Sequence, residues 1–211
     1  MKNLLNLEET IAKDLFNDVT YPYDVLPKLK DYILNKQKEL DANEYEITDD
    51  IYIHKSVNVS DKATILGPTI IGANTQIRPN AYIRGSVIIG ESCVIGNASE
   101  VKNSIIFNNS EVPHFNYVGD SILGYKSHLG AGVILANLKA DGSNIVINSI
   151  NTGLRKIGSI LGDYANIGCN SVLNPGTIIG RNSIVYPLSN VRGIINDNMI
   201  YKDKDHIIKK D

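Results

Sequence analysis

Four histidines are the side chains of this chain best suited to exchange a proton near neutral pH: His54, His114, His128 and His206. His114 follows Pro113 where the repeat described below changes register, and a neutral imidazole there could act as a general base. His128 lies on an outward face and could line a cleft. His54 and His206 fall at the ends of the repeats, where a surface role is expected.

The two cysteines, Cys93 and Cys169, lie inside repeats at different offsets and form no metal-binding motif. We expect two free thiols in a reducing cytosol. A nucleophilic Cys169 is the alternative, but the sequence places no histidine or other base beside it. No metal site is predicted.

The bulk composition excludes several classes of partner. The 211 residues carry 21 Lys plus Arg against 23 Asp plus Glu, and a net charge of −2 gives no signature of nucleic-acid or membrane binding. No stretch approaches the roughly 18 apolar residues of a membrane span, and the N-terminus does not resemble a secretory signal. We expect a cytoplasmic protein.

The elements that must position these side chains follow from a six-residue spacing of apolar residues. Helices repeat at about 3.6 residues and flat strands at two, so neither explains this period, whereas short strands turned at fixed corners do. The positions are Ile53, Val59, Ile65, Ile71, Ile77, Ile83, Ile89, Ile95, Val101, Ile106, Val112, Val118, Leu123, Leu129, Leu135, Leu161, Ile167, Leu173, Ile179, Val185 and Val191.

Three such positions make one triangular turn, so we predict a β-solenoid of about seven coils over 49–198, each rising the ~4.8 Å between neighbouring strands. The inward residues stack on one another, and small residues four places on let the chain turn. Terminal coils of a solenoid need covering. We therefore expect helices at one end and the polar tail 199–211 at the other.

Residues 1–48 lack the spacing and are predicted to form a helical cap or oligomer-packing arm. Leu7, Ile11 and Leu15 are spaced for a short amphipathic helix. Pro27 is well placed near the start of a second helix.

Two interruptions of the repeat mark where a site should be sought. One is an inserted loop at about 137–157, and long excursions from a compact repeat are often functional. The other is the register change in the stretch Val112-Pro-His-Phe-Asn-Tyr-Val-Gly-Asp.

Motifs near these interruptions resemble a known family. The chain is similar to the acetyltransferase half of the bifunctional N-acetylglucosamine-1-phosphate uridylyltransferase/glucosamine-1-phosphate acetyltransferases, most of all the archaeal type. The similarity lies in the stretches Glu100-Val-Lys-Asn, Pro113-His-Phe-Asn-Tyr-Val-Gly-Asp, Leu129-Gly-Ala-Gly and Ala136-Asn-Leu. The resemblance covers about residues 60–195. It implies a left-handed parallel β-helix that assembles as a homotrimer, with each active site between two prisms. No glycine-rich nucleotide loop precedes the repeats, so we expect a stand-alone acetyltransferase-like module.

The resemblance also implies roles on the acceptor side. It makes His114 the general base that takes a proton from the sugar amine as it attacks the acetyl thioester. Lys102 and Arg84, one coil apart, match a pair of phosphate-binding cations, for which a ladder of surface salt bridges is the alternative. Tyr117 matches a tyrosine that contacts the sugar phosphate, and Asn137 matches an asparagine that orients the sugar.

On the acetyl-CoA side, the resemblance implies that backbone around Ala131 holds the thioester oxygen or the pantetheine arm, with Cys169 and Pro187 beside it. His128 stands where the bacterial bifunctional enzymes have an asparagine. Either the sugar pocket differs there or a second imidazole assists.

We therefore expect an acyltransferase that moves an acetyl group from acetyl-CoA to the amine of a hexosamine 1-phosphate, with no metal required. Arg155 and Lys156 in the inserted loop either reach the coenzyme phosphates of a neighbouring subunit or form an ordinary solvated pair. Two other functions stay open. One is a non-catalytic module that binds a sugar phosphate or nucleotide sugar, or scaffolds a separate nucleotidyltransferase; the other is acyl transfer to an amino acid or hydroxyl. The joint presence of His114, Tyr117 and Asn137 near the interruptions favours an enzyme.

Overall fold

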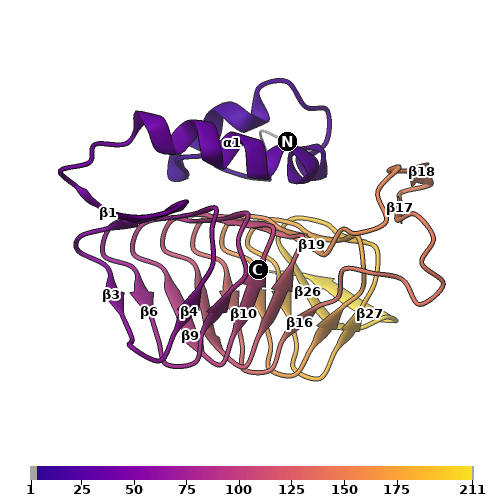
Figure 1. Ribbon diagram of the computed structural model, residues 1–211. Coiled ribbons are helices and arrows are strands. Elements are labelled where there is room, and N and C mark those ends of the chain that lie inside the picture. Colours follow the sequence, from indigo (N-terminus) through magenta and orange to yellow (C-terminus); the bar gives the residue numbers. More distant parts are fainter. Residues whose placement is uncertain (1–3, 211) are drawn as a thin grey trace.

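The computed structural model describes residues 4–210 and forms a parallel β-solenoid with three sheets, here called sheets A, B and C (Figure 1). Sheet A consists of β1 Tyr45–Thr48, β2 Ile51–His54, β5 Thr69–Ile71, β8 Val87–Ile89, β11 Ser104–Ile106, β14 Ile122–Leu123, β19 Ser159–Leu161, β22 Thr177–Ile179 and β25 Ile194–Ile195. Sheet B consists of β3 Asn58–Val59, β6 Gln76–Ile77, β9 Val94–Asn97, β12 Glu111–His114, β15 His128–Leu129, β20 Asn166–Ile167, β23 Ile184–Val185, β26 Met199–Asp203 and β27 His206–Lys209. Sheet C consists of β4 Thr64–Ile65, β7 Tyr82–Ile83, β10 Glu100–Lys102, β13 Tyr117–Gly119, β16 Ile134–Leu135, β21 Val172–Leu173 and β24 Asn190–Val191.

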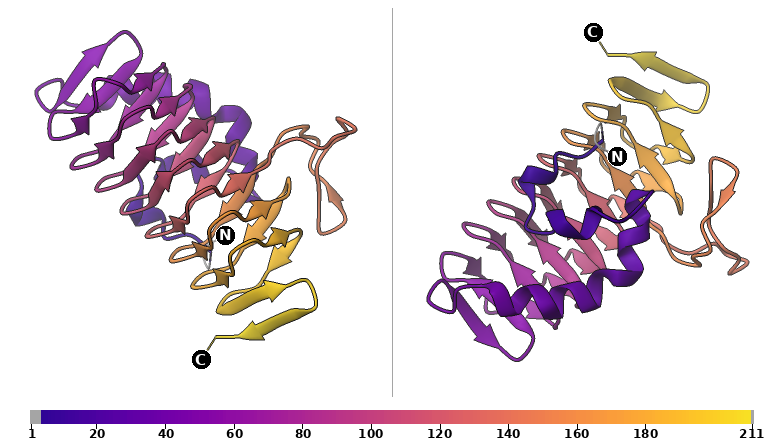
Figure 2. Two further views of the ribbon diagram at one scale, coloured as in Figure 1. Left: turned by 90° about the horizontal axis from the view of Figure 1, so that it is seen from below. Right: turned by 90° about the horizontal axis from the view of Figure 1, so that it is seen from above.

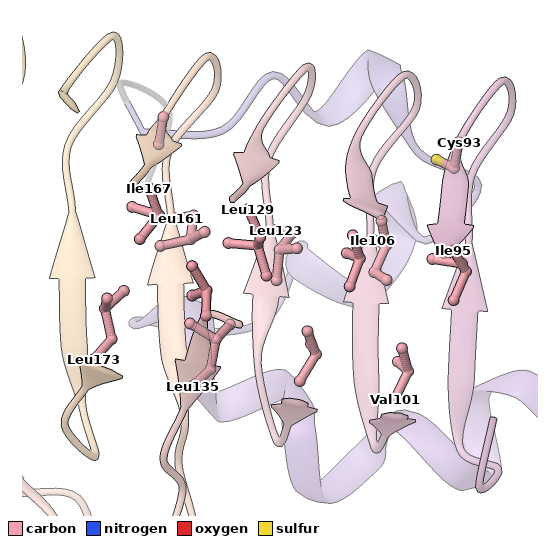
Figure 3. Close-up of a cluster of buried hydrophobic side chains, with 14 of the residues drawn as sticks. Cys93, Ile95, Val101, Ile106, Leu123, Leu129, Leu135, Leu161, Ile167 and Leu173 are labelled. Carbon is pink, nitrogen blue, oxygen red and sulfur yellow. The ribbon is translucent and has the colours of Figure 1, made fainter. Parts of the chain in front are cut away.

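The inward positions of the six-residue spacing form one continuous apolar core along the solenoid axis (Figure 3). Side chains such as Val101 and Leu129 are fully buried there. Each coil supplies one strand to each sheet, as predicted. Seven coils follow the predicted spacing. Ile195 and Tyr201 begin an eighth that the spacing did not include, because the step from Val191 to Ile195 is only four positions.

Serines tie successive coils together where sheet C turns into sheet A. The Ser121 hydroxyl accepts a hydrogen bond from the Ser159 N–H at 3.0 Å and donates to the Gly119 carbonyl at 2.8 Å. The Ser159 hydroxyl is the buried side-chain polar atom without a hydrogen-bond partner among residues 4–210. The chain reaches Ser159 from the inserted loop. The Ser159 hydroxyl does not donate to the carbonyl two residues before it, as the Ser121 hydroxyl does.

Ser121→Ala should lower the free energy of unfolding by about 1–3 kcal/mol, since it leaves the buried Ser159 N–H without an acceptor. Ser159→Ala is the matched control and should lower it by less than about 0.5 kcal/mol, because its hydroxyl has no bond to lose. Urea unfolding followed by circular dichroism measures both. Equal losses in the two variants would contradict this role of the Ser121 hydroxyl.

The N-terminal arm, residues 4–40, lies along the outside of sheet A and not over an end of the solenoid as predicted (Figure 2). Its elements are η1 Leu7–Glu9, η2 Lys13–Phe16, η3 Pro22–Lys28, α1 Leu29–Lys36 and η4 Gln37–Glu39. Buried arm side chains such as Phe16 and Leu29 pack on apolar residues that point out of this face, which would otherwise expose a large apolar patch. These residues are Ile70, Ile88, Ile105, Phe107, Ile122 and Ile160.

The amphipathic helix predicted around Leu7–Leu15 is also wrong in detail. The segment forms two separate 3-10 turns, because Thr10 between them is extended, with φ −155° and ψ 143°. The Thr10 hydroxyl instead accepts from the Ala12 N–H at 3.2 Å, so the chain leaves the first turn and starts the second.

Polar contacts fasten the arm as well. The buried Asp163 carboxylate accepts from the Asn6 N–H at 2.8 Å and the Tyr125 N–H at 2.9 Å, and it lies 3.2 Å from Arg181 Nη2. Burial raises the pKa of Asp163 above its ordinary value, although these donors oppose the shift. The arm is thus held by hydrogen bonds at its start and by apolar packing along its length.

At each end of the solenoid one of the three sheets finishes in an antiparallel strand. β1 pairs with β2 at the first coil, and β27 pairs with β26 at the last. The segment predicted as a polar tail therefore contains two strands, because Tyr201 fills the last inward position and is buried. None of the helices within residues 4–210 is long and apolar enough to cross a membrane.

The inserted loop leaves the solenoid between sheets C and A and projects to one side (Figure 1). It carries the short antiparallel strands β17 Val146–Ile147 and β18 Ile150–Asn151. The stack of coils continues across it, since β14 pairs directly with β19.

Candidate functional site

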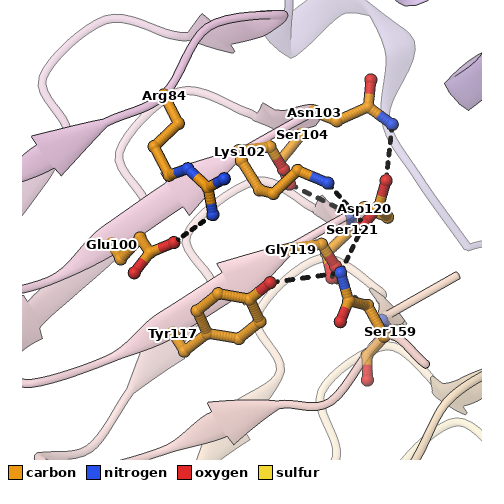
Figure 4. A network of polar contacts seen from close by, with 11 residues as sticks. Arg84, Glu100, Lys102, Asn103, Ser104, Tyr117, Gly119, Asp120, Ser121 and Ser159 are labelled. Atoms are coloured by element: carbon orange, nitrogen blue, oxygen red, sulfur yellow. Dashed lines mark hydrogen bonds and ion pairs between the residues drawn. The ribbon is translucent and has the colours of Figure 1, made fainter. Parts of the chain in front are cut away.

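Four of the predicted substrate-binding residues gather on sheet C and at the corner that leads into sheet A (Figure 4). Arg84 directly follows β7, Lys102 ends β10, Tyr117 begins β13 and Asn137 comes two residues after β16. Each residue belongs to a different coil, and the four coils are consecutive. The regular stacking of sheet C therefore brings together residues that are up to 53 positions apart in the chain.

Each of the two predicted phosphate-binding cations has a carboxylate partner. Arg84 Nη1 lies 2.7 Å from Glu100 Oε1, and Lys102 Nζ lies 3.2 Å from Asp120 Oδ2. The Arg84–Glu100 pair is exposed, so water or an anionic ligand can replace it at little cost. The Lys102 partner is only 6% exposed and holds its cation more firmly. This is the arrangement expected of a salt-bridge ladder, and the phosphate role of both cations stays a prediction.

Asp120 connects the rest of this cluster. Its Oδ1 accepts from Asn103 Nδ2 at 2.8 Å, and its Oδ2 accepts from Asn137 Nδ2 at 2.5 Å. Asn137 Nδ2 also lies 3.2 Å from the Tyr117 hydroxyl oxygen. Burial raises the pKa of the Tyr117 phenol, and the nearby Asp120 carboxylate adds to the rise. The Tyr117 hydroxyl therefore stays protonated at neutral pH and can donate to a ligand.

Asp120→Asn should lower the free energy of unfolding by about 1–3 kcal/mol, because three donors then share one amide oxygen and the Lys102 ammonium loses its anion. Asp61→Asn at an exposed position is the control, with an expected change below about 0.5 kcal/mol. Urea unfolding measures both. A similarly small change in the two variants would show that the Asp120 carboxylate does not hold the cluster together.

The predicted base and the coenzyme-side residues lie at another corner, between sheets B and C. His114 ends β12, and Ala131, Cys169 and Pro187 take the equivalent place in the next three coils. The carbonyls of His114, Ala131 and Cys169 each accept a backbone N–H from the following coil, at 3.0, 2.8 and 2.9 Å. These four residues are called the corner column below. No acceptor for the Ala131 N–H is found within residues 4–210, which leaves it available to a ligand carbonyl.

His114 and His128 line one pocket of about 450 Å³ on sheet B. The pocket also contains Ala131 and Cys169 of the corner column. His128 Nδ1 lies 2.8 Å from Glu111 Oε2, on the neighbouring strand. The pocket thus combines two imidazoles, an exposed thiol and a carboxylate.

Asn116 holds the corner on which His114 stands. The buried Asn116 Oδ1 accepts from the His114 N–H at 3.0 Å, and its Nδ2 donates to the Gly130 carbonyl at 2.8 Å. The corner separates the pocket on sheet B from the cluster on sheet C, and no side-chain hydrogen bond joins the two groups in the described part of the chain. The predicted residues therefore form two groups on adjoining faces.

Sequence reasoning missed four residues that hold the predicted site residues in place by hydrogen bonds or ion pairs. These are Glu100, Asp120, Asn116 and Glu111. For Asp120 a signal existed, because Asn103 and Asp120 take equivalent places 17 residues apart in successive coils.

The inserted loop keeps its basic residues close to itself. Arg155 Nε donates to the Gly142 carbonyl at 3.0 Å, so its reach toward a coenzyme phosphate stays a prediction. Between residues 4 and 210 no three His, Cys, Asp or Glu side chains come close enough to hold a metal ion.

Two family models match this chain. One is described as the EIF2B subunit epsilon LbH domain and covers residues 48–152, and the other is described as the hexapeptide repeat of succinyl-transferase and covers residues 159–186. The "Bifunctional protein GlmU" of Methanococcus vannielii is 36% identical over 202 residues, which are 92% of this chain and 49% of that protein. The chain is a hexapeptide-repeat protein. The predicted left-handed β-helix of hexapeptide repeats is therefore confirmed.

The motif-based resemblance of this hexapeptide-repeat protein is confirmed as well. A "Bifunctional sugar-1-phosphate nucleotidylyltransferase/acetyltransferase" of Sulfurisphaera tokodaii is 35% identical over 170 residues, 70% of this chain and 42% of that protein. The chain spans about half the length of the curated relatives it matches, which is consistent with their acetyltransferase half.

Solved structures of similar fold include PerB from Caulobacter crescentus in complex with CoA and GDP-perosamine, with a TM-score of 0.37 and 19% identity over 76% of this chain and 57% of that one. Another is the UDP-N-acetylglucosamine acyltransferase of Francisella novicida, with a TM-score of 0.49 and 13% identity over 76% of this chain and 67% of that one.

Proposed function

We propose that this protein transfers an acetyl group from acetyl-CoA to the amine of a hexosamine 1-phosphate. The observation that carries the proposal is the corner column, in which His114 lies one coil from the free Ala131 N–H and three residues from Tyr117. Acyl transfer to an amine needs a proton acceptor, a donor for an oxygen that gains negative charge, and groups that hold the acceptor. The similarity to the two relatives supports acetyl transfer, since the name of the Sulfurisphaera tokodaii protein contains the word acetyltransferase.

The chemistry would proceed as follows at these residues. The amine nitrogen attacks the thioester carbonyl and His114 accepts the amine proton. The C–S bond then breaks, and His114 gives the proton to the leaving sulfur, so that CoA departs as its thiol. The Ala131 N–H donates to the carbonyl oxygen as that oxygen gains charge. Cys169 and Pro187 pack along the pantetheine arm.

The cluster on sheet C would hold the acceptor. Lys102 and Arg84 bind the sugar phosphate by exchanging their carboxylate partners for it, and the exposed Arg84 pair exchanges more easily. Tyr117 donates to the phosphate, and Asn137 orients the sugar. We further propose a homotrimer, because the arm covers sheet A and leaves sheets B and C to form a site between subunits. The proposed location is the cytoplasm, where acetyl-CoA would be the co-substrate.

A second candidate function is a non-catalytic module that binds a sugar phosphate or scaffolds a nucleotidyltransferase. The carboxylate partners of Arg84 and Lys102 favour it, since neither cation is unpaired. The match to a domain described for an EIF2B subunit is also compatible with a scaffold.

The test is a thiol-release assay with acetyl-CoA and glucosamine 1-phosphate, galactosamine 1-phosphate or glucosamine 6-phosphate, combined with calorimetry of the same sugars. CoA release that depends on an amino-sugar 1-phosphate is the expected result. Sugar-phosphate binding without CoA release would instead support the second candidate. Neither release nor binding would contradict both.

A further inference from the structure

A carboxylate–imidazole pair in the sheet B pocket takes no part in the mechanism above. Glu111 and His128 stand opposite each other in register on the neighbouring strands β12 and β15. Glu111 Oε2 lies 2.8 Å from His128 Nδ1. The two side chains are 50% and 39% exposed, so both solvent and a ligand in the pocket can reach them.

The Glu111 contact orients the imidazole. An ionised carboxylate only accepts hydrogen bonds, so the contact places the imidazole proton on Nδ1 and leaves the Nε2 lone pair of His128 free. A carboxylate imposes the same tautomer on the base of a catalytic triad. The other charged or titratable side chains that line the pocket are Arg78, His114 and Cys169. His128 therefore shares a pocket with the proposed base and has an acceptor nitrogen of its own.

In the reaction proposed above the amine nitrogen loses two protons, and only one acceptor has been assigned. Near neutral pH an amino-sugar amine enters largely as its ammonium, R–NH3+, and its nitrogen keeps a single hydrogen in the amide product. One of the two protons ends on the CoA sulfur, whose C–S bond breaks as the N–C bond forms. The other goes to solvent. One imidazole can carry only one of these protons at a time.

We propose that His128, positioned by Glu111, takes the first proton from the bound ammonium and passes it to solvent. His114 takes the second proton during attack and returns it to the leaving sulfur. His128 is then a second catalytic residue, and Glu111 is its positioning residue. This inference rests on the proposed function, because only an amine acceptor brings the additional proton.

The chain offers a matched control pair. His206 Nδ1 lies 2.8 Å from Asp203 Oδ2 in the β26–β27 hairpin, and neither residue lines the sheet B pocket. This pair has the same chemistry and is also exposed, with side chains 70% and 55% accessible. Asp203→Asn therefore removes an equivalent contact at a place where no proton has to move.

The kinetic test compares His128→Asn, Glu111→Gln and Asp203→Asn in the full chain, with acetyl-CoA and the amino-sugar phosphate both saturating. We expect kcat to fall about 10²-fold in His128→Asn and about 10-fold in Glu111→Gln, with KM values within about 3-fold of wild type. The loss of kcat in His128→Asn should shrink toward high pH, because the amine then enters already neutral and brings no additional proton. Asp203→Asn should keep the wild-type profile.

The outcomes separate this inference from the proposed function. If the wild type turns over and kcat is unchanged in both pocket variants, the inference is overturned and the proposed function stands. The same holds if the loss of kcat in His128→Asn is equally large at high pH. Absence of CoA release by the wild type overturns the proposed function and, with it, the proton assignment.

An independent readout concerns the tautomer of His128. Imidazole ¹⁵N correlation spectra of the wild type above the titration range should show the Nδ1–H form of His128, and Glu111→Gln should lose this preference because an amide can donate as well as accept. His206 provides the reference signal in the same spectra. An Nε2–H form of His128 in the wild type overturns the positioning role of Glu111.

Discussion

Replacing His114 with alanine should lower the turnover of acetyl-CoA and glucosamine 1-phosphate by about 10²–10⁴-fold. The loss follows because the other members of the corner column provide a backbone N–H, a thiol and a proline, and none of them is positioned to accept the amine proton. KM for acetyl-CoA should change little, since Ala131 and Cys169 remain. The measurement is the rate of CoA release at saturating substrates, followed with a thiol reagent.

His54→Ala is the control for this experiment. His54 lies on the first coil with its Nδ1 2.8 Å from the Ser56 hydroxyl and does not line the sheet B pocket. The contact between Asn116 and His114 uses the His114 backbone N–H and survives the substitution, so His114→Ala should keep the fold of the corner. Wild-type rates in both variants would remove His114 as the base.

Phe107→Ala should lower the free energy of unfolding by about 3–5 kcal/mol, the loss expected for a large aromatic side chain in a core. Phe107 is fully buried between the solenoid and the N-terminal arm, and its ring lies 6.1 Å from that of Phe16 at 74°, an edge-to-face contact. The next residue, Asn108, donates its N–H to the Glu9 carbonyl of the arm at 3.0 Å. Urea unfolding of the full chain provides the measurement.

Phe115→Ala is the matched control, because that ring is 59% exposed and its removal should change the free energy of unfolding by less than about 0.5 kcal/mol. A double-mutant cycle with Phe16→Ala should give a coupling of about 0.5–1.5 kcal/mol between the two rings. A loss in Phe107→Ala no larger than that in Phe115→Ala would show that the arm is not an integral part of the folded body.

The core could be predicted from the sequence because it depends on one regular period. Each short strand supplies one inward side chain, and residues such as Val101 and Leu129 occupy that position whatever lies outside the solenoid. The eighth coil was not predicted because the step into it is four positions, shorter than any other step in the spacing that leads from one coil to the next without an inserted loop.

The place of the arm depends on a second pattern. On sheet A the residue before the inward one is also apolar, as at Ile70, Ile88 and Ile105. On sheet B it is more often polar, as at Gln76 and Glu111. This difference indicates which face needs covering. It does not indicate which segment covers it, because that depends on the direction in which the chain enters the first coil.

The candidate site could be predicted only in part for a related reason. The family motifs predicted Lys102 and His114 as site residues. The partner of a charged side chain is harder to predict, because an ion pair forms only where stacked coils bring two side chains close together. Asp120 is 18 residues from Lys102 and Glu111 is 17 from His128, so both partners belong to an adjacent coil. Register changes alter these separations from coil to coil, and the folded stack is needed to show which residues meet.

The antiparallel strands at the two ends have a consequence for how copies of this chain can associate. A coil of a parallel solenoid ends in a row of unpaired backbone N–H and C=O groups, onto which a coil of another copy could add. β1 reverses the strand direction at the first edge of sheet A, and β27 does so at the last edge of sheet B. An incoming parallel coil therefore meets the wrong hydrogen-bond pattern on one sheet at each end. Lys204, in the turn before the last strand, and Lys209, at its end, add charge there. End-to-end growth into fibres is therefore disfavoured, and contacts between copies are directed to the sides of the prism.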